Sequence, residues 1–133
     1  MISAQPIETV AEILEKTLEA PVEVLGDLYV VIIQRDMAIK SGECTMLFKI
    51  ENEITFQDLH QHGKMLNKAE ILLLPEELPV FSSALISQGA SLPINYTQRL
   101  IMELDVYSLY MESWELPEQF AGRLAAALKA IDL

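Results

Sequence analysis

The sequence contains few of the residues on which disulfide frameworks, metal sites and hydrolytic triads depend. It has a single cysteine, Cys44, and only two histidines, His60 and His62. One cysteine cannot form a disulfide bond within the chain. The two histidines fall in a predicted turn with no cysteine or carboxylate at ligand spacing, whereas a metal site needs three or four converging ligands. We therefore expect no bound metal and no histidine base for a catalytic triad.

Motifs that bind phosphate or activate a nucleophile are also missing. The five glycines are scattered along the chain, and none forms part of a glycine-rich phosphate loop. The sequence has no G-x-S-x-G, H-E-x-x-H or C-x-x-C motif. Adjacent acids such as Glu76 and Glu77 fall where a helix is predicted to begin. Their negative charges interact favourably with the positive end of the helix dipole there. These observations predict no catalytic residue and no cofactor.

Basic residues are scarce as well. Nine lysines and arginines stand against 20 acids, which gives a net charge of −11. Such a chain repels nucleic-acid backbones and anionic membrane surfaces, so neither is an expected partner. No apolar run is long enough for a membrane span, and the first residues lack the basic and apolar regions of a secretory leader. We expect a cytoplasmic protein.

What the sequence does have is strong apolar periodicity. Its 133 residues, 51% of them hydrophobic, are enough for one domain that covers residues 1–133. Three- and four-residue spacing predicts helices over residues 5–18, over 76–88 and from Pro117 onward. In the second of these helices, Leu78, Phe81 and Leu85 form the predicted buried stripe, with Ile86 beside it. Alternating or continuous apolar segments predict strands over residues 22–25, 28–34, 44–59, 64–74, 91–98 and 104–111.

The order of these segments predicts an α+β fold: a mostly antiparallel sheet of five to seven strands with three helices. Glu77-Leu78-Pro79 and Glu115-Leu116-Pro117 each open a helix after a strand, which suggests two duplicated β-β-α units. Residues 69–98 should form a strand, a helix and a second strand in the middle of the fold. Any functional site is expected beside this segment.

Part of the sequence resembles a known bacterial family. From Ile54 to Gln98 the chain has a hairpin with a glycine turn, a strand that leads into a helix with two acids at its start, and a further strand. The positions in step with the family pattern are Gly63, Leu66, Asn67, Glu70, Glu76, Glu77, Ala84, Leu85 and Gly89. Residues 110–121 and the pair Arg35-Asp36, which is similar to a proline-arginine turn of the family, extend the match. The chain is thus similar to the LppY/LpqO-like proteins, whose function is not established.

The departures from that pattern bear on function. Tyr96-Thr97-Gln98 stands where the family has a His-Asn-His segment, and Tyr110 stands where it has a further histidine. Tyrosine, threonine and glutamine form hydrogen bonds, but they are poor metal ligands and poor bases near pH 7. The resemblance therefore implies a degenerate member that keeps the fold without the histidines.

Two functional hypotheses follow from this reading. The first is a non-catalytic domain that binds a small ligand or another protein, including a second copy of itself through an exposed strand. The alternative is an enzyme that acts on a small polar molecule through a pocket of Arg35, Tyr96, Gln98 and Tyr110. Convergence of these four side chains in one pocket would favour the enzyme.

Overall fold

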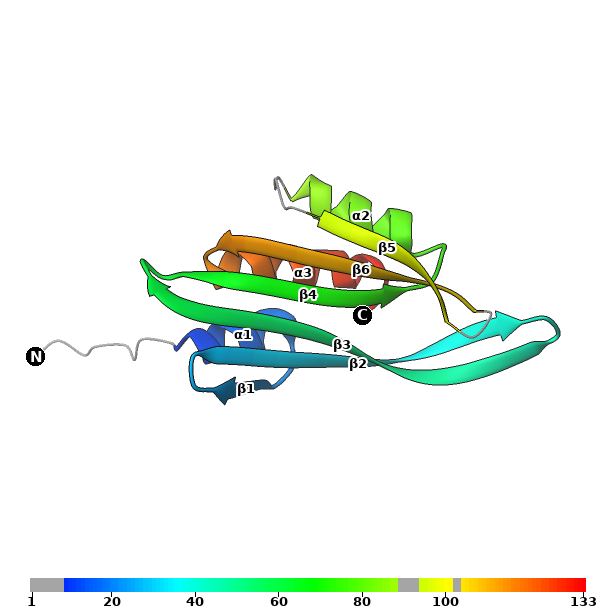
Figure 1. The fold of residues 1–133 in the computed structure, drawn as a ribbon, viewed down its shortest axis with the longest axis horizontal. Coiled ribbons are helices and arrows are strands. Elements are labelled where there is room, and N and C mark those ends of the chain that lie inside the picture. Colours follow the sequence, from blue (N-terminus) through cyan, green and yellow to red (C-terminus); the bar gives the residue numbers. More distant parts are fainter. Residues whose placement is uncertain (1–8, 89–93, 102–103) are drawn as a thin grey trace, which may run out of the picture.

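The computed structural model describes residues 9–88, 94–101 and 104–133, and for Ser41, 94–101 and 104–105 it describes the backbone alone. In this part of the chain, six antiparallel strands form one open sheet in the order β1-β2-β3-β4-β6-β5 (Figure 1). The strands are β1 (Val22–Leu25), β2 (Leu28–Ser41), β3 (Cys44–Gln61), β4 (Lys64–Leu73), β5 (Ile94–Ile101) and β6 (Leu104–Glu115). The helices are α1 (Val10–Leu18), α2 (Leu78–Ser87) and α3 (Pro117–Ala130). The predicted α+β fold is confirmed.

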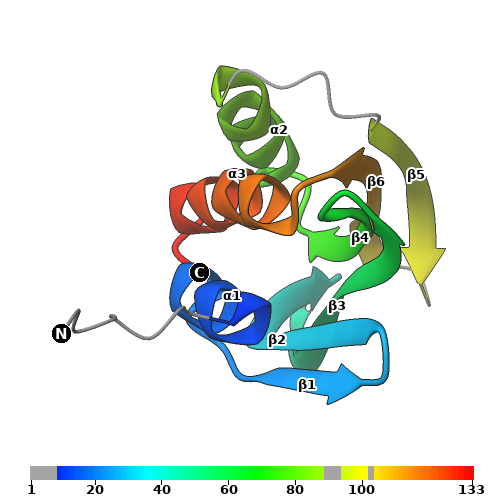
Figure 2. The same ribbon diagram turned by 90° about the vertical axis from the view of Figure 1, so that its left-hand side faces the viewer.

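The three helices cover one face of the sheet and leave the other face open (Figure 2). The core lies between the helices and the sheet. It contains Phe56 from β3 and Phe120 from α3, whose rings meet edge to face with their centroids 6.0 Å apart. Both side chains are fully buried. An edge-to-face pair adds about 1 kcal/mol to the free energy gained by burying the two rings. None of the described helices has the length and hydropathy needed to cross a bilayer.

Two β-β-α units, β3-β4-α2 and β5-β6-α3, follow each other in the chain, as the sequence suggested. The expectation that residues 69–98 lie in the middle of the fold is wrong for β5, which is an edge strand of the sheet. The inner strands of the two units, β4 and β6, pair with each other, and Ile71 pairs with Leu109. Ser108 lies 38 residues after Glu70, and Glu115 follows Glu77 at the same spacing. Leu109 also lies 38 residues after Ile71, so Ile71 pairs with the residue that is equivalent to it in the other unit. The two units are therefore related by an approximate twofold axis that passes through this pair.

Just before the helix of each unit, a glutamate binds an arginine. Glu77 Oε2 accepts a hydrogen bond from Arg35 Nη2 at 2.8 Å, with the two side chains 15% and 10% exposed. Glu115 Oε1 forms the corresponding contact with Arg123 Nη2. The sequence assigned Glu77 to the helix dipole, whereas in the structure it holds β2 against the start of α2.

The long hairpin of β2 and β3 corrects one sequence expectation. A turn was expected at Arg35-Asp36, but β2 continues through both residues and stays paired with β3 as far as Ser41 and Cys44. The alternation explains the extension, because Met37 and Ile39 are buried while Asp36, Ala38 and Lys40 are exposed. Their side chains form a second small core with Val106 of β6.

Asn52 marks the point where the hairpin separates from the rest of the sheet. The ladder between β3 and β4 ends at the pair Glu53 and Glu70. Beyond it, the fully buried Asn52 accepts a hydrogen bond from the backbone N–H of Leu72 through Oδ1 at 2.9 Å. A side chain thus replaces the next backbone partner, and past this point the hairpin extends beyond β4 and β6 (Figure 1).

Two helix details also differ from expectation. The first helix was predicted over residues 5–18. In the structure α1 begins at Val10, where the Thr9 hydroxyl accepts the N–H of Glu12 and caps the helix, and residues 5–8 lie outside the described residues. In α2 Phe81 and Leu85 are buried and Leu78 packs against the core, as predicted. Ile86, expected beside them, is 67% exposed.

Candidate functional site

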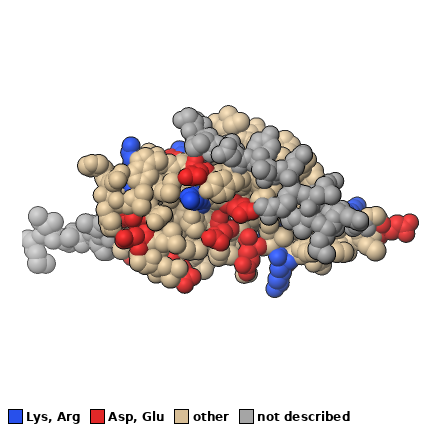
Figure 3. Space-filling view, in the orientation of Figure 1, with Lys and Arg blue, Asp and Glu red and all other residues tan. Residues whose placement is uncertain are grey.

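The uncovered face of the sheet carries polar side chains in aligned rows. One row crosses three strands from Glu53 through Glu70 to Tyr110, and the next runs from Thr55 through Lys68 to Glu112. Figure 3 views the molecule from this side and shows acidic side chains gathered along the middle of the face. No described helix lies over these rows (Figure 2). Glu53 and Glu70 are exposed, and the other four side chains are partly exposed.

A depression of about 170 Å³ lies where the two rows meet. The residues that line it are Glu53, Thr55, Lys68, Ala69, Glu70 and Tyr110. It therefore presents two carboxylates, one ammonium group and two hydroxyls within a small area. Polar groups of both charges that converge on a hollow are a common way to orient a small polar ligand.

Hydrogen bonds hold the β6 side of this depression. Ser108 Oγ donates to Glu70 Oε1 at 2.7 Å, and Tyr110 Oη donates to Glu112 Oε2 at 3.2 Å. Partial burial, together with the carboxylates of Glu112 and Glu70, raises the pKa of Tyr110 above its ordinary value. The phenol therefore stays protonated near neutral pH and can form hydrogen bonds, but it cannot act as a base.

The direct pairing of Glu53 with Glu70 has an energetic cost. Like charges opposite each other on neighbouring strands repel and destabilise the sheet locally. Lys68 lies two residues before Glu70 on the same face of β4, where its charge offsets part of this repulsion. Of the residues around the depression, only Tyr110 was predicted from the sequence as a ligand contact. The polar residues Glu53 and Thr55 on β3, and Lys68 and Glu70 on β4, stand at alternate positions in the sequence, and this pattern could have indicated that they share one face of the sheet.

Arg35, unlike Tyr110, is held in an ion pair at the start of α2. Arg35 does not line the depression; its guanidinium lies in the ion pair with Glu77 at the start of α2. The Nη1 atom of Arg35 is buried without a hydrogen-bond partner among the described residues. Arg35 therefore serves to connect the hairpin to α2.

The other two predicted pocket residues lie on β5. Tyr96 pairs with Leu109 and Gln98 pairs with Tyr107, whereas the partner of Tyr110 is Asn95. The side chains of Tyr96 and Gln98 lie outside the described residues. The pocket of four converging side chains therefore stays a prediction.

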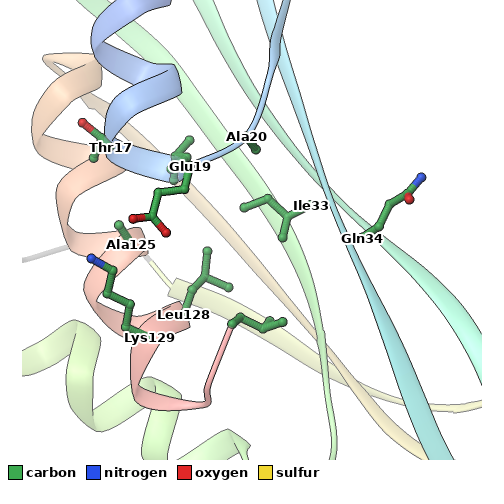
Figure 4. A pocket seen from close by; sticks show the side chains of 10 residues that line it. Thr17, Glu19, Ala20, Ile33, Gln34, Ala125, Leu128 and Lys129 are labelled. Atoms are coloured by element: carbon green, nitrogen blue, oxygen red, sulfur yellow. The ribbon is translucent and has the colours of Figure 1, made fainter.

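A second hollow, of about 140 Å³, lies on the opposite side of the sheet where α1 and α3 end (Figure 4). Its walls are mostly apolar and include Ile33 and Leu128, while Glu19 and Lys129 supply charges at its edge. Glu19 ends α1 with a left-handed backbone, φ 54°. The apolar walls distinguish this hollow from the polar depression on the uncovered face.

The histidines lie away from both hollows. His60 Nε2 is 3.1 Å from Asp27 Oδ1, and this contact joins the end of β3 to the β1–β2 turn. The hydrogen bond to Asp27 and the negative charges of Asp27 and Asp58 raise the pKa of His60. Asp27, which is distant from His60 in the sequence, therefore lies beside it in the fold. Among the described residues, however, no three histidine, cysteine or acidic side chains form a group that could hold a metal ion.

The fold and the depression define an α+β domain with an open sheet face that carries a small polar hollow. A family model described as Domain of Unknown Function (DUF1259) matches residues 9–130. The chain therefore belongs to this family. No curated protein and no solved structure matches it. The resemblance to the LppY/LpqO-like proteins stays a prediction.

Proposed function

We propose that this protein is a non-catalytic binding domain that holds a small polar ligand on the uncovered face of its sheet. The depression between β3, β4 and β6 carries this proposal. Glu53 and Glu70 suit a cationic group of the ligand, Lys68 suits an anionic group, and Thr55 and Tyr110 suit hydroxyl or amide groups. About 170 Å³ is well below the size of pockets for drug-sized molecules, so the ligand is a small metabolite.

The contacts of the predicted pocket residues support binding over catalysis. The raised pKa of Tyr110 keeps its phenol protonated, which makes it a poor base. Arg35 is held by Glu77 away from the depression. Ser108 donates its hydroxyl proton to a carboxylate and has no histidine beside it among the described residues, so the arrangement of an activated nucleophile is missing.

The proposal can be tested with a panel of amino acids, amino sugars and small polyamines. Heteronuclear NMR should show at least one member that shifts the backbone amides of residues 53–55, 68–70 and 108–112. Glu53→Gln and Tyr110→Phe should weaken that binding. Lys129→Gln, at the edge of the second hollow, should leave it unchanged. Binding that maps to the second hollow, or no binder in the panel at millimolar concentration, would count against the proposal.

We further propose a cytoplasmic bacterial protein similar to the LppY/LpqO-like family. The residues in step with that family support the similarity, and a free, exposed Cys44 suits a reducing compartment. The net charge of −11 supports a protein that binds neither nucleic acid nor membranes. A fluorescent fusion that localises to the cell envelope would overturn the cytoplasmic assignment.

A further inference from the structure

The outer edge of β2 is long and has no strand beside it in the described part of the chain. β1 pairs with β2 only from Leu28 to Val31. From Ile32 to Ser41, the inner edge of β2 pairs with β3 throughout, while no described strand pairs with the outer edge. An unpaired edge presents backbone donors and acceptors to any strand that fits it. The composition of this edge decides which strand that is.

The side chains along this edge complement themselves. Asp36 and Lys40 are exposed and lie two residues on either side of the exposed Ala38. When a second copy of the chain is placed antiparallel with Ala38 opposite Ala38, each Asp36 lies opposite a Lys40. A centre at Asp36 or at Lys40 would place like charges opposite each other, and a shift by one residue would remove both opposite-charge pairs. Only the register centred on Ala38 satisfies both charges.

The same register accounts for an exposed leucine near the tip of the hairpin. Leu47 is 77% exposed and pairs with Ala38 across the hairpin. Across the paired strands of the two copies, the side chains would lie in the order Leu47, Ala38, Ala38, Leu47. The first two belong to one chain and the last two to the other. The small alanines leave room for the two leucines to pack over them. Lys49, which pairs with Asp36, would give that carboxylate a lysine on each side.

The other face of the edge is also complementary. With Ala38 at the centre, Met37 of one copy lies opposite Ile39 of the other. Both residues belong to the small core under the hairpin, and Ile39 pairs with Met46, which is 43% exposed. The second core would therefore extend across the junction and cover more of Met46.

We propose that two copies of this chain associate by antiparallel pairing of their β2 edges about Ala38, which joins their sheets into one. The partner strand is that of a second copy, because the segment Asp36-Met37-Ala38-Ile39-Lys40 matches itself in charge and shape when two copies lie antiparallel. The interface is separate from the polar depression on β3, β4 and β6, so it goes beyond the proposed ligand binding and does not depend on it.

Sedimentation velocity over a range of concentrations tests the association. The unchanged chain should show a monomer–dimer equilibrium. Asp36→Lys and Lys40→Asp each place like charges opposite each other twice and should weaken the dimer about tenfold or more. The double substitution Asp36→Lys with Lys40→Asp restores opposite charges and should restore the dimer. All three changes are at exposed positions, so circular dichroism and melting temperature should stay close to those of the unchanged chain.

Asp36→Lys is the decisive variant. It lowers the net negative charge, so general repulsion between two acidic chains predicts tighter association, whereas the register predicts weaker association. Glu118→Lys makes the same charge change at an exposed position of α3 and serves as the control. It should leave the dimer as stable as before or make it slightly more stable.

Cross-linking tests the register itself. Ala38→Cys in a Cys44→Ser background should form a disulfide between two copies under mild oxidation. Ser87→Cys, at the exposed end of α2 in the same background, should not. A chain that is monomeric at all concentrations, a dimer that does not respond to Asp36→Lys, or a double substitution that folds but fails to restore the dimer would each overturn the proposal.

Discussion

Arg35 and Glu77 are 42 residues apart in the sequence, yet the guanidinium of Arg35 donates to Glu77 Oε2 over 2.8 Å. The other oxygen of Glu77, Oε1, accepts the backbone N–H of Leu74 at 2.9 Å. One carboxylate therefore connects the β2–β3 hairpin, the end of β4 and the first turn of α2. Because both side chains are largely buried, neither charge can be left unpaired without a large cost.

Removing one member of this pair should destabilise the protein. We expect Arg35→Met to lower the free energy of unfolding by about 3 kcal/mol, because it leaves the Glu77 carboxylate buried without its cation. The double variant Arg35→Met with Glu77→Gln should be more stable than Arg35→Met alone, since glutamine is neutral and still accepts the Leu74 N–H. Urea denaturation measures both. Equal stability of the single and double variants would show that the charge of Glu77 is not the cause.

Asn52 should stabilise the fold through its one acceptor contact. Asn52→Ala leaves the N–H of Leu72 buried without a partner, so we expect a loss of about 1–3 kcal/mol. Hydrogen exchange at the Leu72 amide should accelerate more than exchange at Ile71 or Leu73. Asn67→Ala is the matched control, because Asn67 is equally buried but donates to Ser113 and Glu115 instead. Slow exchange at Leu72 in the Asn52 variant would contradict this assignment.

The contact of His60 with Asp27 predicts a specific pH dependence. The pKa of folded His60 is raised from its ordinary value of 6.5, chiefly by the hydrogen bond to Asp27. Protonated His60 thus favours the folded state, and its contribution is fully present below pH 6.5 and lost as pH rises through the raised pKa. NMR titration should show that Asp27→Asn lowers the pKa of His60. Glu43→Gln, which removes an acid from the far turn of the hairpin, should leave that pKa unchanged.

Two glycine substitutions should change stability in opposite directions. Gly122 lies within α3, and a Cβ there would meet no atom within 4 Å. Gly122→Ala should therefore raise the free energy of unfolding by about 0.5–1 kcal/mol through helix propensity. Gly63 has φ +78° in the turn between β3 and β4. Gly63→Ala should lower the free energy of unfolding by about 1 kcal/mol because alanine is strained at that angle. Thermal melts distinguish the two, and a destabilising Gly122→Ala would be inconsistent with the open space at that position.

The order of strands and helices could be predicted because it depends on local patterns. Proline at the start of α3 and the alternation in β6 are visible in the sequence without any knowledge of partners. A turn was expected at Arg35-Asp36 because the pair is similar to a proline-arginine turn of the LppY/LpqO-like family. Burial of Met37 and Ile39 continues the strand past these charges, and Glu77, which pairs with Arg35, is distant in sequence.

The candidate site could be predicted only in part for a similar reason. Tyr110 was recognised, but Glu53 and Lys68 become its neighbours through the register of three strands. Register depends on how whole strands pair, and a shift of one residue would turn every side chain of a strand to the opposite face. The spacing of residues along one strand does not contain that information.

The approximate twofold axis through Ile71 and Leu109 has a consequence for how the chain can be divided. Each β-β-α unit presents its inner strand to the other, so a fragment with one unit would have an unpaired strand and an uncovered apolar surface. A chain of half the length could satisfy that strand only by binding another copy of itself. The arrangement therefore has the architecture of a dimer whose two subunits are joined in a single polypeptide.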